Sequence, residues 1–348
     1  FILKAYLDMI LLAMIKLPHL INSLPLSKLI IPTPSPAAMA AAALAVAAVY
    51  YYIKKKNTKL MFSSAAAFGF CAAAVASSLM RIGTAEFTFV NVGQGDGAVI
   101  RSYMGDTILI DGGGGSSFSE YDPGEAVFVP FLESKGYSVI EAAFVSHYHK
   151  DHVQGIIAAI DRLNVKNVFV PPRGSCIDED MAGWADEIER TAAENGTAVH
   201  YISEDTRIRF MSGITLTVHV PVSAVSVSDD GNDTSLLIKA EYGGASCLYT
   251  GDMTQFAEKY AVADGADVDA DILKVPHHGS KSSSSEEFVS AVSPEYSVIS
   301  CGENNPYGHP SEETLERLAG TTVLRTDING TVTFTVGKDG IKEASVFK

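Results

Sequence analysis

One segment of seven residues, Ser146–His152, places three histidines and one aspartate within six consecutive positions. The run Ala142–Val145 before it is short and apolar, which predicts a buried β-strand. Apolar residues recur at helical spacing over Val153–Leu163, which predicts a helix. The cluster therefore lies on a strand-to-helix turn at the carboxyl end of a strand, where α/β sheets usually bind their ligands. A chain with this feature is predicted to fold as an α/β protein.

The side chains of this cluster are metal ligands by type, because neutral imidazoles and a carboxylate suit Zn²⁺, Mn²⁺ or Fe²⁺. They are too close in sequence to bind one ion with good geometry, so we expect two sites. His147 and His149 would hold one metal, and Asp151 and His152 a second. Two metals about 3.5–4 Å apart are a known device for cleaving phosphate esters. The alternative is a polar surface turn, but clustered His and Asp favour a metal or catalytic site.

Charge divides the chain into two parts of different character. Residues 1–83 carry a net charge of +7 and residues 84–348 a net charge of −22, within a total of −15. We therefore expect a membrane segment over 1–83 and an acidic globular domain over 84–348. Such a domain would not attract nucleic acid through bulk electrostatics, so a phosphate substrate would be drawn in locally by the metals. The four cysteines form no C-x-x-C pair and predict neither a disulfide framework nor a zinc finger.

Two alanine-rich stretches without charged residues, 37–53 and 60–80, predict two transmembrane helices. The first ends in three tyrosines, as expected at a membrane interface, and the basic loop Lys54–Lys59 follows it. Because positive loops stay in the cytoplasm, the second helix would place everything after Arg81 on the extracellular side of the cell membrane. The alternative is a buried alanine-rich hairpin within a soluble protein.

Five candidate site residues share one property, which is that each follows a short apolar strand. They are Asp111, His147, Asp252, His277 and His309. If those strands lie in neighbouring sheets, their ends can meet at one edge. The mixture of strands and helices, with reactive residues at strand ends, suggests two sheets with helices outside.

Two aspartates, Asp96 and Asp111, lie in glycine-rich turns before the histidine cluster. They are candidates for carboxylates that orient ligand histidines, or, equally, for residues that only stabilise a turn. These turns match neither a Walker A nor a Rossmann fingerprint, because no Gly-Lys-Ser/Thr follows and no G-x-G-x-x-G opens a helix.

The remaining candidates complete a two-metal hydrolytic site. The Asp252 carboxylate can bridge the ions, and His277 or His278 completes the second site. A water between the ions would lose a proton near neutral pH and become the nucleophile. His309 would contact the developing charge or donate to the leaving group, or it is simply a surface turn residue. Asp151 is assigned to the catalytic set as well as to the ligands.

The H-x-H-x-D-H pattern over His147–His152, preceded by Asp111 and followed by Asp252 and a distal histidine, resembles the metallo-β-lactamase superfamily. The resemblance covers about residues 85–348 and implies an αββα sandwich. Four further motifs resemble the ComEC competence-protein branch of that superfamily. They are Asn91–Asp96, Thr250–Asp252, Lys274–Ser280 and Tyr307–Pro310.

In that branch a multi-helix membrane channel imports transforming DNA. A metallo-β-lactamase-like domain follows outside the membrane, and its proposed activity is degradation of the non-imported strand. The resemblance therefore implies a metal-dependent phosphodiesterase with two divalent ions, Zn²⁺ or Mn²⁺, and DNA as the substrate. It also implies that the missing channel helices or other competence proteins are partners of this chain at the membrane.

The chain departs from the superfamily pattern at the third histidine of the first metal. His200 and His219 lie in the right interval, but each sits in a strand-like run. Asn232 and Ser235 stand where the ComEC-like branch tends to show Asn and Ser. Together with Ser280 of the His-His-Gly-Ser motif, they are candidates for contacting substrate or supporting the ligands. The missing histidine and this motif favour phosphoesters over β-lactams.

Two other functions stay open from the sequence. One is a hydrolase of another ester, such as a phosphorylcholine ester, a lactone or a β-lactam. The other is a non-catalytic module that positions DNA at a channel mouth, which predicts no metal and no turnover. The full set of ligand-type residues argues against the non-catalytic module.

Overall fold

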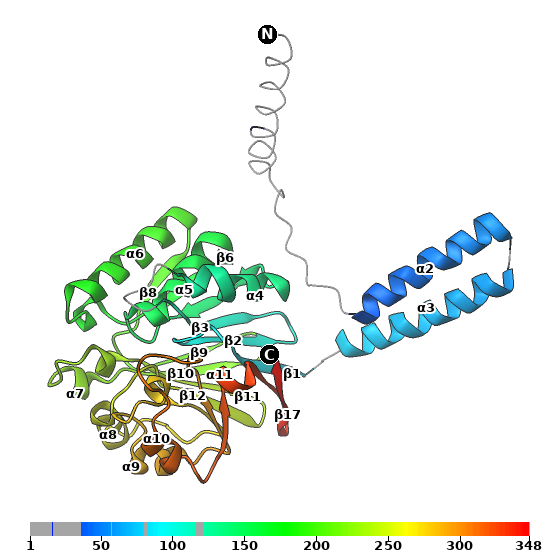
Figure 1. Ribbon diagram of the computed structural model, residues 1–348. Coiled ribbons are helices and arrows are strands. Elements are labelled where there is room, and N and C mark those ends of the chain that lie inside the picture. Colours follow the sequence, from blue (N-terminus) through cyan, green and yellow to red (C-terminus); the bar gives the residue numbers. More distant parts are fainter. Residues whose placement is uncertain (1–15, 17–35, 57, 80–82, 116–120, 348) are drawn as a thin grey trace.

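The computed structural model of the chain describes residues 16, 36–56, 58–79, 83–115 and 121–347 (Figure 1). The predicted membrane segment over 1–83 therefore lies partly outside the described residues. Its described part consists of two helices, α2 (Pro36–Lys55) and α3 (Thr58–Leu79), which pack against each other as a hairpin.

The two hairpin helices coincide with the stretches predicted to cross a membrane. Among the helices of the described residues, however, none is both long and apolar enough to do so. The prediction of two transmembrane helices is therefore not supported. Both helices are rich in alanine, whose single methyl group removes little apolar surface from water, so freedom from charge was a poor guide to their hydrophobicity.

The first sheet has eight strands in the order β17-β16-β1-β2-β3-β5-β7-β8. Strands from β17 to β3 pair antiparallel, and strands from β3 to β8 pair parallel. The bounds are β1 (Thr84–Phe89), β2 (Gly97–Ser102), β3 (Thr107–Gly112), β5 (Ala142–Phe144), β7 (Asn167–Val170), β8 (Ala198–Tyr201), β16 (Thr331–Gly337) and β17 (Gly340–Phe347).

The second sheet has seven strands in the order β15-β14-β13-β12-β11-β10-β9. Strands β12 to β15 run parallel, and strands β9 to β12 pair antiparallel. The bounds are β9 (Thr206–Arg209), β10 (Thr215–His219), β11 (Leu237–Tyr242), β12 (Ala245–Tyr249), β13 (Ile272–Lys274), β14 (Tyr296–Ile299) and β15 (Thr322–Arg325). Two short strands, β4 (Val139–Ile140) and β6 (Asn164–Val165), pair separately.

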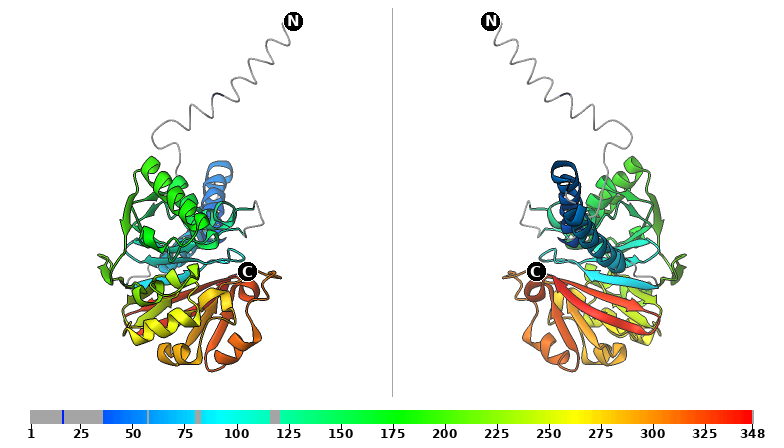
Figure 2. Two further views of the ribbon diagram at one scale, coloured as in Figure 1. Left: turned by 90° about the vertical axis from the view of Figure 1, so that its left-hand side faces the viewer. Right: turned by 90° about the vertical axis from the view of Figure 1, so that its right-hand side faces the viewer.

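Helices cover the outer face of each sheet, so that the domain has four layers (Figures 1 and 2). On the first sheet lie α4 (Val129–Ser134), α5 (Lys150–Arg162) and α6 (Glu179–Asn195). On the second lie α8 (Gln255–Ala263), α9 (Glu286–Val292) and α10 (Glu312–Arg317), with the short helices α7 (Val222–Val225) and α11 (Thr326–Asn329) nearby. The predicted mixed α/β sandwich is confirmed.

The sheets face each other across a core of buried apolar side chains. Phe89 of the first sheet stacks on Tyr249 of the second, with ring centroids 5.6 Å apart. Alternate residues of most strands point into this core, and the opposite faces of the parallel strands pack under the outer helices. Burial on both faces explains why several strands read as short continuous apolar runs in the sequence.

Helix α5 begins at Lys150, three residues earlier than predicted. His149 is its N-terminal cap residue, and Asp151 lies in its first turn, where a negative charge interacts favourably with the helix dipole. Further along, Gly155 packs directly on β3, since a Cβ atom at this position would collide with the backbone oxygen of Gly112. Two facing glycines thus allow α5 to bring its first turn against the end of β3.

Candidate metal centre

The carboxyl ends of five strands meet at one edge of the sandwich. Strands β3 and β5 belong to the parallel part of the first sheet, and β12, β13 and β14 to the parallel part of the second. Each of the five candidate residues that follow a strand in the sequence lies at this edge or in the loop that leaves it. The two sheets therefore contribute to one site, as open α/β sheets commonly do.

Asp111 fixes the orientation of the His152 ring through the ring nitrogen Nδ1. The Nδ1 atom of His152 lies 2.8 Å from Oδ2 of Asp111, and both side chains are almost completely buried. Asp111 also accepts hydrogen bonds from the backbone N–H and the hydroxyl of Ser146, at 2.8 and 2.7 Å. A carboxylate at Nδ1 fixes the tautomer of the ring and leaves Nε2 available to a metal.

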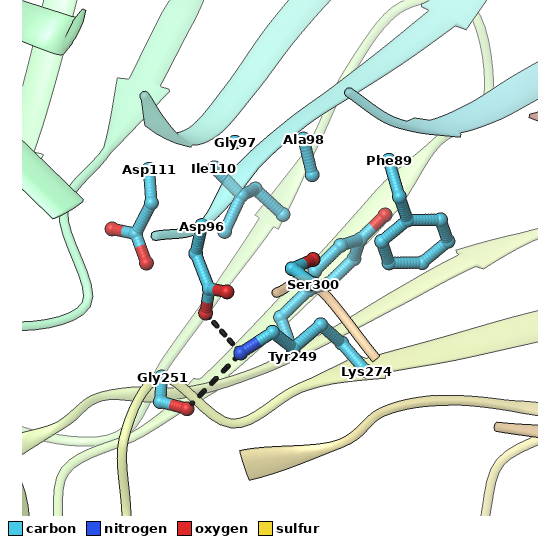
Figure 3. A pocket seen from close by; sticks show the side chains of 10 residues that line it. All are labelled: Phe89, Asp96, Gly97, Ala98, Ile110, Asp111, Tyr249, Gly251, Lys274 and Ser300. Atoms are coloured by element: carbon cyan, nitrogen blue, oxygen red, sulfur yellow. Dashed lines mark hydrogen bonds and ion pairs between the residues drawn. The ribbon is translucent and has the colours of Figure 1, made fainter. Parts of the chain in front are cut away.

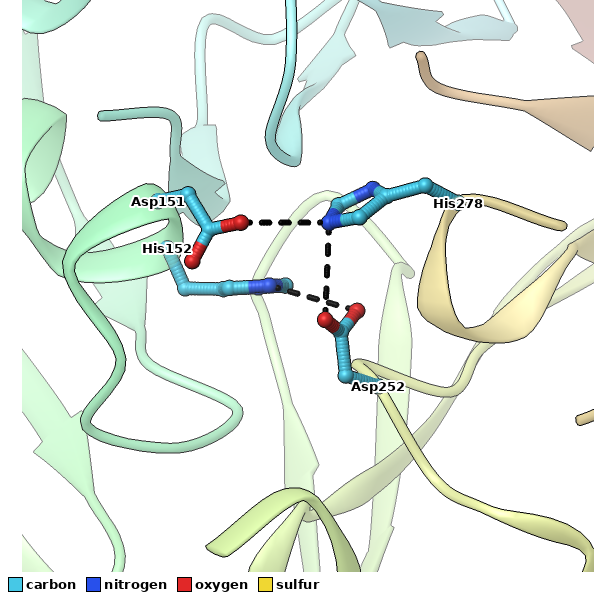
Figure 4. Close-up of side chains that lie close together, drawn as sticks. All are labelled: Asp151, His152, Asp252 and His278. Atoms are coloured by element: carbon cyan, nitrogen blue, oxygen red, sulfur yellow. Dashed lines mark hydrogen bonds and ion pairs between the residues drawn. The ribbon is translucent and has the colours of Figure 1, made fainter. Parts of the chain in front are cut away.

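Four side chains bring one potential ligand atom each into a group. Asp151, His152, Asp252 and His278 place these atoms within 4.8 Å of one another (Figure 4). Nε2 of His152 is 3.3 Å from Oδ1 of Asp252, and Nε2 of His278 is 3.4 Å from Oδ2 of the same carboxylate. Nε2 of His278 also lies 3.3 Å from Asp151. Asp252 thus stands between the two imidazoles.

His147 and His149 form a neighbouring pair. Nε2 of His147 lies 3.0 Å from Nδ1 of His149, close to the spacing of two nitrogens on one ion. The Nδ1 atom of His147 is held by the hydroxyl of Ser146 at 3.0 Å. The rings of His147 and His152 are 4.2 Å apart between centroids, so this pair adjoins the group of four.

His277 and His278 follow β13 in the left-handed region of backbone conformation, with φ of 51° and 54°. Nδ1 of His278 donates to the backbone oxygen of Ser300, 3.0 Å away, which directs Nε2 toward the group of four. His277 is less deeply placed, with its Nε2 3.8 Å from Asp252 and its side chain 24% exposed. His309 lies beyond it, 5.7 Å away between ring centroids.

A buried lysine lies near the Nδ1 side of the two candidate ligand imidazoles, the side opposite Asp252. Lys274 forms an ion pair with Asp96, and its amine also donates to the backbone oxygen of Gly251 at 3.4 Å (Figure 3). Asp96 is in turn 3.3 Å from Nδ1 of His278 and 3.8 Å from Nδ1 of His152. One carboxylate therefore connects a fixed positive charge to the rear of both imidazoles.

The buried polar atoms of the site suit divalent ions. Several side-chain atoms have no hydrogen-bond partner although they are out of contact with solvent, and such atoms are costly to bury. Those at this edge are Oδ1 of Asp96, Nε2 of His152, Oδ1 of Asn232, Oδ1 of Asp252, Nδ1 of His277 and Nδ1 of His309. Nε2 of His152 and Oδ1 of Asp252 belong to the group of four. Nitrogen and oxygen ligands of this kind fit Zn²⁺ or Mn²⁺.

The side chains of this group shift one another's pKa values strongly. Burial would lower the pKa of His152 and of His278, but neighbouring carboxylates, with Asp252 foremost, raise both well above the usual value. Burial would raise the pKa of Asp151, yet the hydrogen bond from His278 and nearby positive charge hold it at about 2. Burial and adjacent histidines lower the pKa of His147 well below normal. A divalent ion would replace the protons on the two imidazoles, so metal binding releases protons.

An open cleft of about 220 Å³ leads to the group of four. Besides the ligand candidates it is lined by Gln94, Asn232, Tyr307 and His309. Asn232, which was predicted from the resemblance to stand in place of the third histidine, lines this cleft, whereas His200 and His219 are engaged elsewhere. His200 bonds to Asn167 at 3.0 Å, and His219 to Asp205 at 2.9 Å.

Two candidates lie beside the site without facing the ligands. The hydroxyl of Ser235 donates to the backbone oxygen of Asn232 at 2.7 Å and accepts from the backbone N–H of Asp252 at 3.1 Å, so it braces the loops. The hydroxyl of Ser280 pairs with that of Ser282 at 2.9 Å. Prediction from sequence also missed Lys274, although it lies in one of the motifs that carried the resemblance.

The model of the family described as the metallo-beta-lactamase superfamily matches residues 90–303, which is more than half of the chain. The chain therefore belongs to the metallo-β-lactamase superfamily. This membership and the candidate histidine and aspartate ligands at the sheet edge define a metal-dependent hydrolase.

Competence proteins are among the relatives of this chain, which confirms the resemblance to the ComEC type. ComE operon protein 3 of Bacillus subtilis (strain 168) is 30% identical over 261 residues, covering 72% of this chain and 33% of that protein. Competence protein ComA of Neisseria gonorrhoeae is 40% identical over 116 residues, covering 32% and 17%. Recombination protein 2 of Haemophilus influenzae (strain ATCC 51907 / DSM 11121 / KW20 / Rd) is 29% identical over 229 residues, covering 66% and 26%. The chain spans a third or less of the length of these relatives.

Proposed function

We propose that residues 84–348 form a metal-dependent phosphodiesterase that cleaves DNA during competence. The observation that carries this proposal is the group Asp151, His152, Asp252 and His278, whose ligand atoms lie within 4.8 Å of one another beside an open cleft. The competence relatives support DNA as the substrate. They also support a place at the membrane, and we infer that the domain works on its extracellular side with the rest of a channel as partner.

The donor set supports two ions. Asp151, His152 and His278 would hold one, His147 and His149 would hold the other, and a bridging carboxylate would come from Asp252. When bound, such ions supply a nucleophile from water near neutral pH and polarise the phosphoryl oxygen. The Asp111 carboxylate keeps Nδ1 of His152 protonated, and the backbone oxygen of Ser300 does the same for Nδ1 of His278.

His309 stands on the open side of the cleft, where a leaving group would depart. Burial and the positive charge of neighbouring histidines lower the pKa of His309 to about 4, so the ring is neutral at physiological pH. A neutral imidazole can still donate a hydrogen bond from one nitrogen to a developing negative charge. We therefore assign His309 to the stabilisation of charge on the phosphate or the leaving oxygen.

The position of Asn232 supports a phosphoester over a β-lactam substrate. Its side chain lines the cleft, and its Oδ1 atom is buried without a hydrogen-bond partner. If this amide stands in place of the third histidine of the superfamily pattern, it would leave room beside the ions for substrate oxygens. A phosphate diester can use that space, since it brings two non-bridging oxygens to the site.

The test is cleavage of DNA by the purified chain after removal and controlled return of Mn²⁺ or Zn²⁺. Metal-dependent cleavage by the wild type is expected to fall by at least about 100-fold in Asp252→Asn, since a shared ligand is lost. Asp205→Asn is the matched control, because Asp205 also contacts a histidine but lies outside the site. Metal binding without DNA cleavage would point to another ester, and absence of metal binding would leave the DNA-positioning module.

A further inference from the structure

An exposed tyrosine stands at the mouth of the metal site. Tyr307 is 52% exposed, and it lies on the loop of residues 302–310, which we name the Tyr307 loop. Its ring is nearly parallel to the ring of His309, at 26° with centroids 5.8 Å apart. The ring is half-exposed although His309 packs beside it, so part of its surface is accessible to a planar group from solvent.

The Tyr307 loop is held in place by hydrogen bonds within the chain. The Asn305 side-chain amide donates to the backbone oxygens of Gly302 and His309, at 2.9 and 2.6 Å, and accepts from the backbone N–H of His309 at 3.0 Å. Gly302 in turn donates its backbone N–H to the side chain of Gln94 at 3.2 Å. These hydrogen bonds hold the backbone on both sides of Tyr307.

Tyr307 and His309 line two clefts. One is the cleft of about 220 Å³ that contains the metal-ligand candidates. The other has a volume of about 400 Å³. It contains one lysine, Lys281, and two glutamates, so charge alone does not favour a phosphate backbone there.

We propose that Tyr307 is a stacking site for the nucleobase next to the phosphate that is cleaved. This inference rests on the proposed phosphodiesterase activity and adds to it a residue that contacts the base of a single-stranded substrate. Every base has a π-face, so the site would take any sequence. In a duplex the base is already stacked and paired, so reaching Tyr307 would require unstacking. With a domain charge of −22, stacking would supply affinity that the backbone contacts do not.

Three variants separate stacking from other effects. Tyr307→Ala removes the ring, Tyr307→Phe keeps it without the hydroxyl, and Tyr103→Ala removes a comparably exposed tyrosine on the β2–β3 turn. Binding of a short single-stranded oligonucleotide by fluorescence anisotropy and kcat/KM for its cleavage are both measured with the metal-loaded chain. Loss of one base stack should weaken binding by roughly 5- to 150-fold in Tyr307→Ala. Tyr307→Phe and Tyr103→Ala should stay within about twofold of wild type.

A second experiment uses the same oligonucleotide with an abasic site beside the cleaved phosphate. On it, wild type and Tyr307→Ala should perform alike, because no base is present to stack. Cleavage of intact single strands that does not change in Tyr307→Ala would overturn the stacking site and leave the phosphodiesterase standing. Binding that depends on Tyr307 without any cleavage would support the stacking site and overturn the phosphodiesterase. Equal kcat/KM on duplex and single strands would also overturn the inference.

Discussion

Replacing Asp111 with asparagine tests the orientation of His152 with little change in shape. Oδ1 of Asp111 accepts the backbone N–H of Ser146 at 2.8 Å, while Oδ2 is 2.8 Å from Nδ1 of His152. In Asp111→Asn the amide oxygen must keep accepting the Ser146 N–H. If the amide turned over, its NH₂ group would face the Ser146 N–H, and two donors would oppose each other. The amide nitrogen then faces Nδ1 of His152 and donates to it.

This reversal leaves the neutral ring of His152 protonated on Nε2, the nitrogen that faces Asp252 at 3.3 Å, whereas in wild type the neutral ring keeps its proton on Nδ1. A protonated nitrogen cannot bind a metal, so binding must first move the proton back against an unfavourable contact. Loss of a carboxylate behind a histidine ligand costs about 10- to 100-fold in metal affinity, or roughly 1.4–2.7 kcal/mol. The free energy of unfolding should change less than the metal affinity. Burial raises the pKa of Asp111, so the folded chain already disfavours the charge that the substitution removes.

The assay is competition between the metal-free chain and a chromophoric chelator for Zn²⁺ and Mn²⁺, which requires no substrate. Asp205→Asn is the control, because Asp205 also accepts a backbone N–H and lies 2.9 Å from Nδ1 of a histidine, away from the site. Its metal affinity should equal that of wild type. Equal affinity in Asp111→Asn, with an unaltered circular dichroism spectrum, would refute the assignment of the tautomer to Asp111.

Three further predictions concern stability, each measured by denaturant unfolding of the metal-free chain. Lys274→Met leaves the buried Asp96 charge unpaired and should lower the free energy of unfolding by about 3–5 kcal/mol. Adding Asp96→Asn to this variant should recover stability, and a failure to recover would count against this reason. Gly155→Ala should cost about 1–3 kcal/mol because its methyl meets the β3 backbone, whereas Gly183→Ala, with open space in α6, should stabilise by about 0.5–1 kcal/mol. The pKa of His309 is depressed from 6.5 to about 4, so the unfolded chain binds more protons than the folded chain between these values. The stability of wild type relative to His309→Gln should therefore rise with pH from about 4 to 6.5 and then level off; a flat difference would contradict the buried neutral ring.

The sequence predicted the fold well because its strongest signals are local. Short apolar runs ending in Asp or His identify the strands and the edge at which they meet, and the sandwich follows from them. The helix pair at α2 and α3 was also predicted, but its membrane character was not supported. A stretch can lack charged residues and still be only weakly hydrophobic, because each alanine contributes little apolar surface.

The contacts within the site depend on geometry that spacing does not encode. His277 and His278 follow the same strand, and a carbonyl from Ser300 in a different loop decides which ring turns toward Asp252. Lys274 reads as one polar residue in a short strand, and only the opposing sheet reveals Asp96 as its partner. Pairings between distant segments, such as these, have no signature within either segment.

The pairing of β1 with β16 has a consequence for when this protein can work. The hydroxyls of Thr88 and Thr333 are 3.1 Å apart across these strands but 245 positions apart in sequence. The first strand of the domain thus pairs with a strand that is made much later, and distant pairings of this kind form slowly. His147 to His152 leave the ribosome long before His278 does, so no complete ligand group exists on a partial chain. We therefore expect the domain to be unable to load metal at this group until the chain has been made past His278.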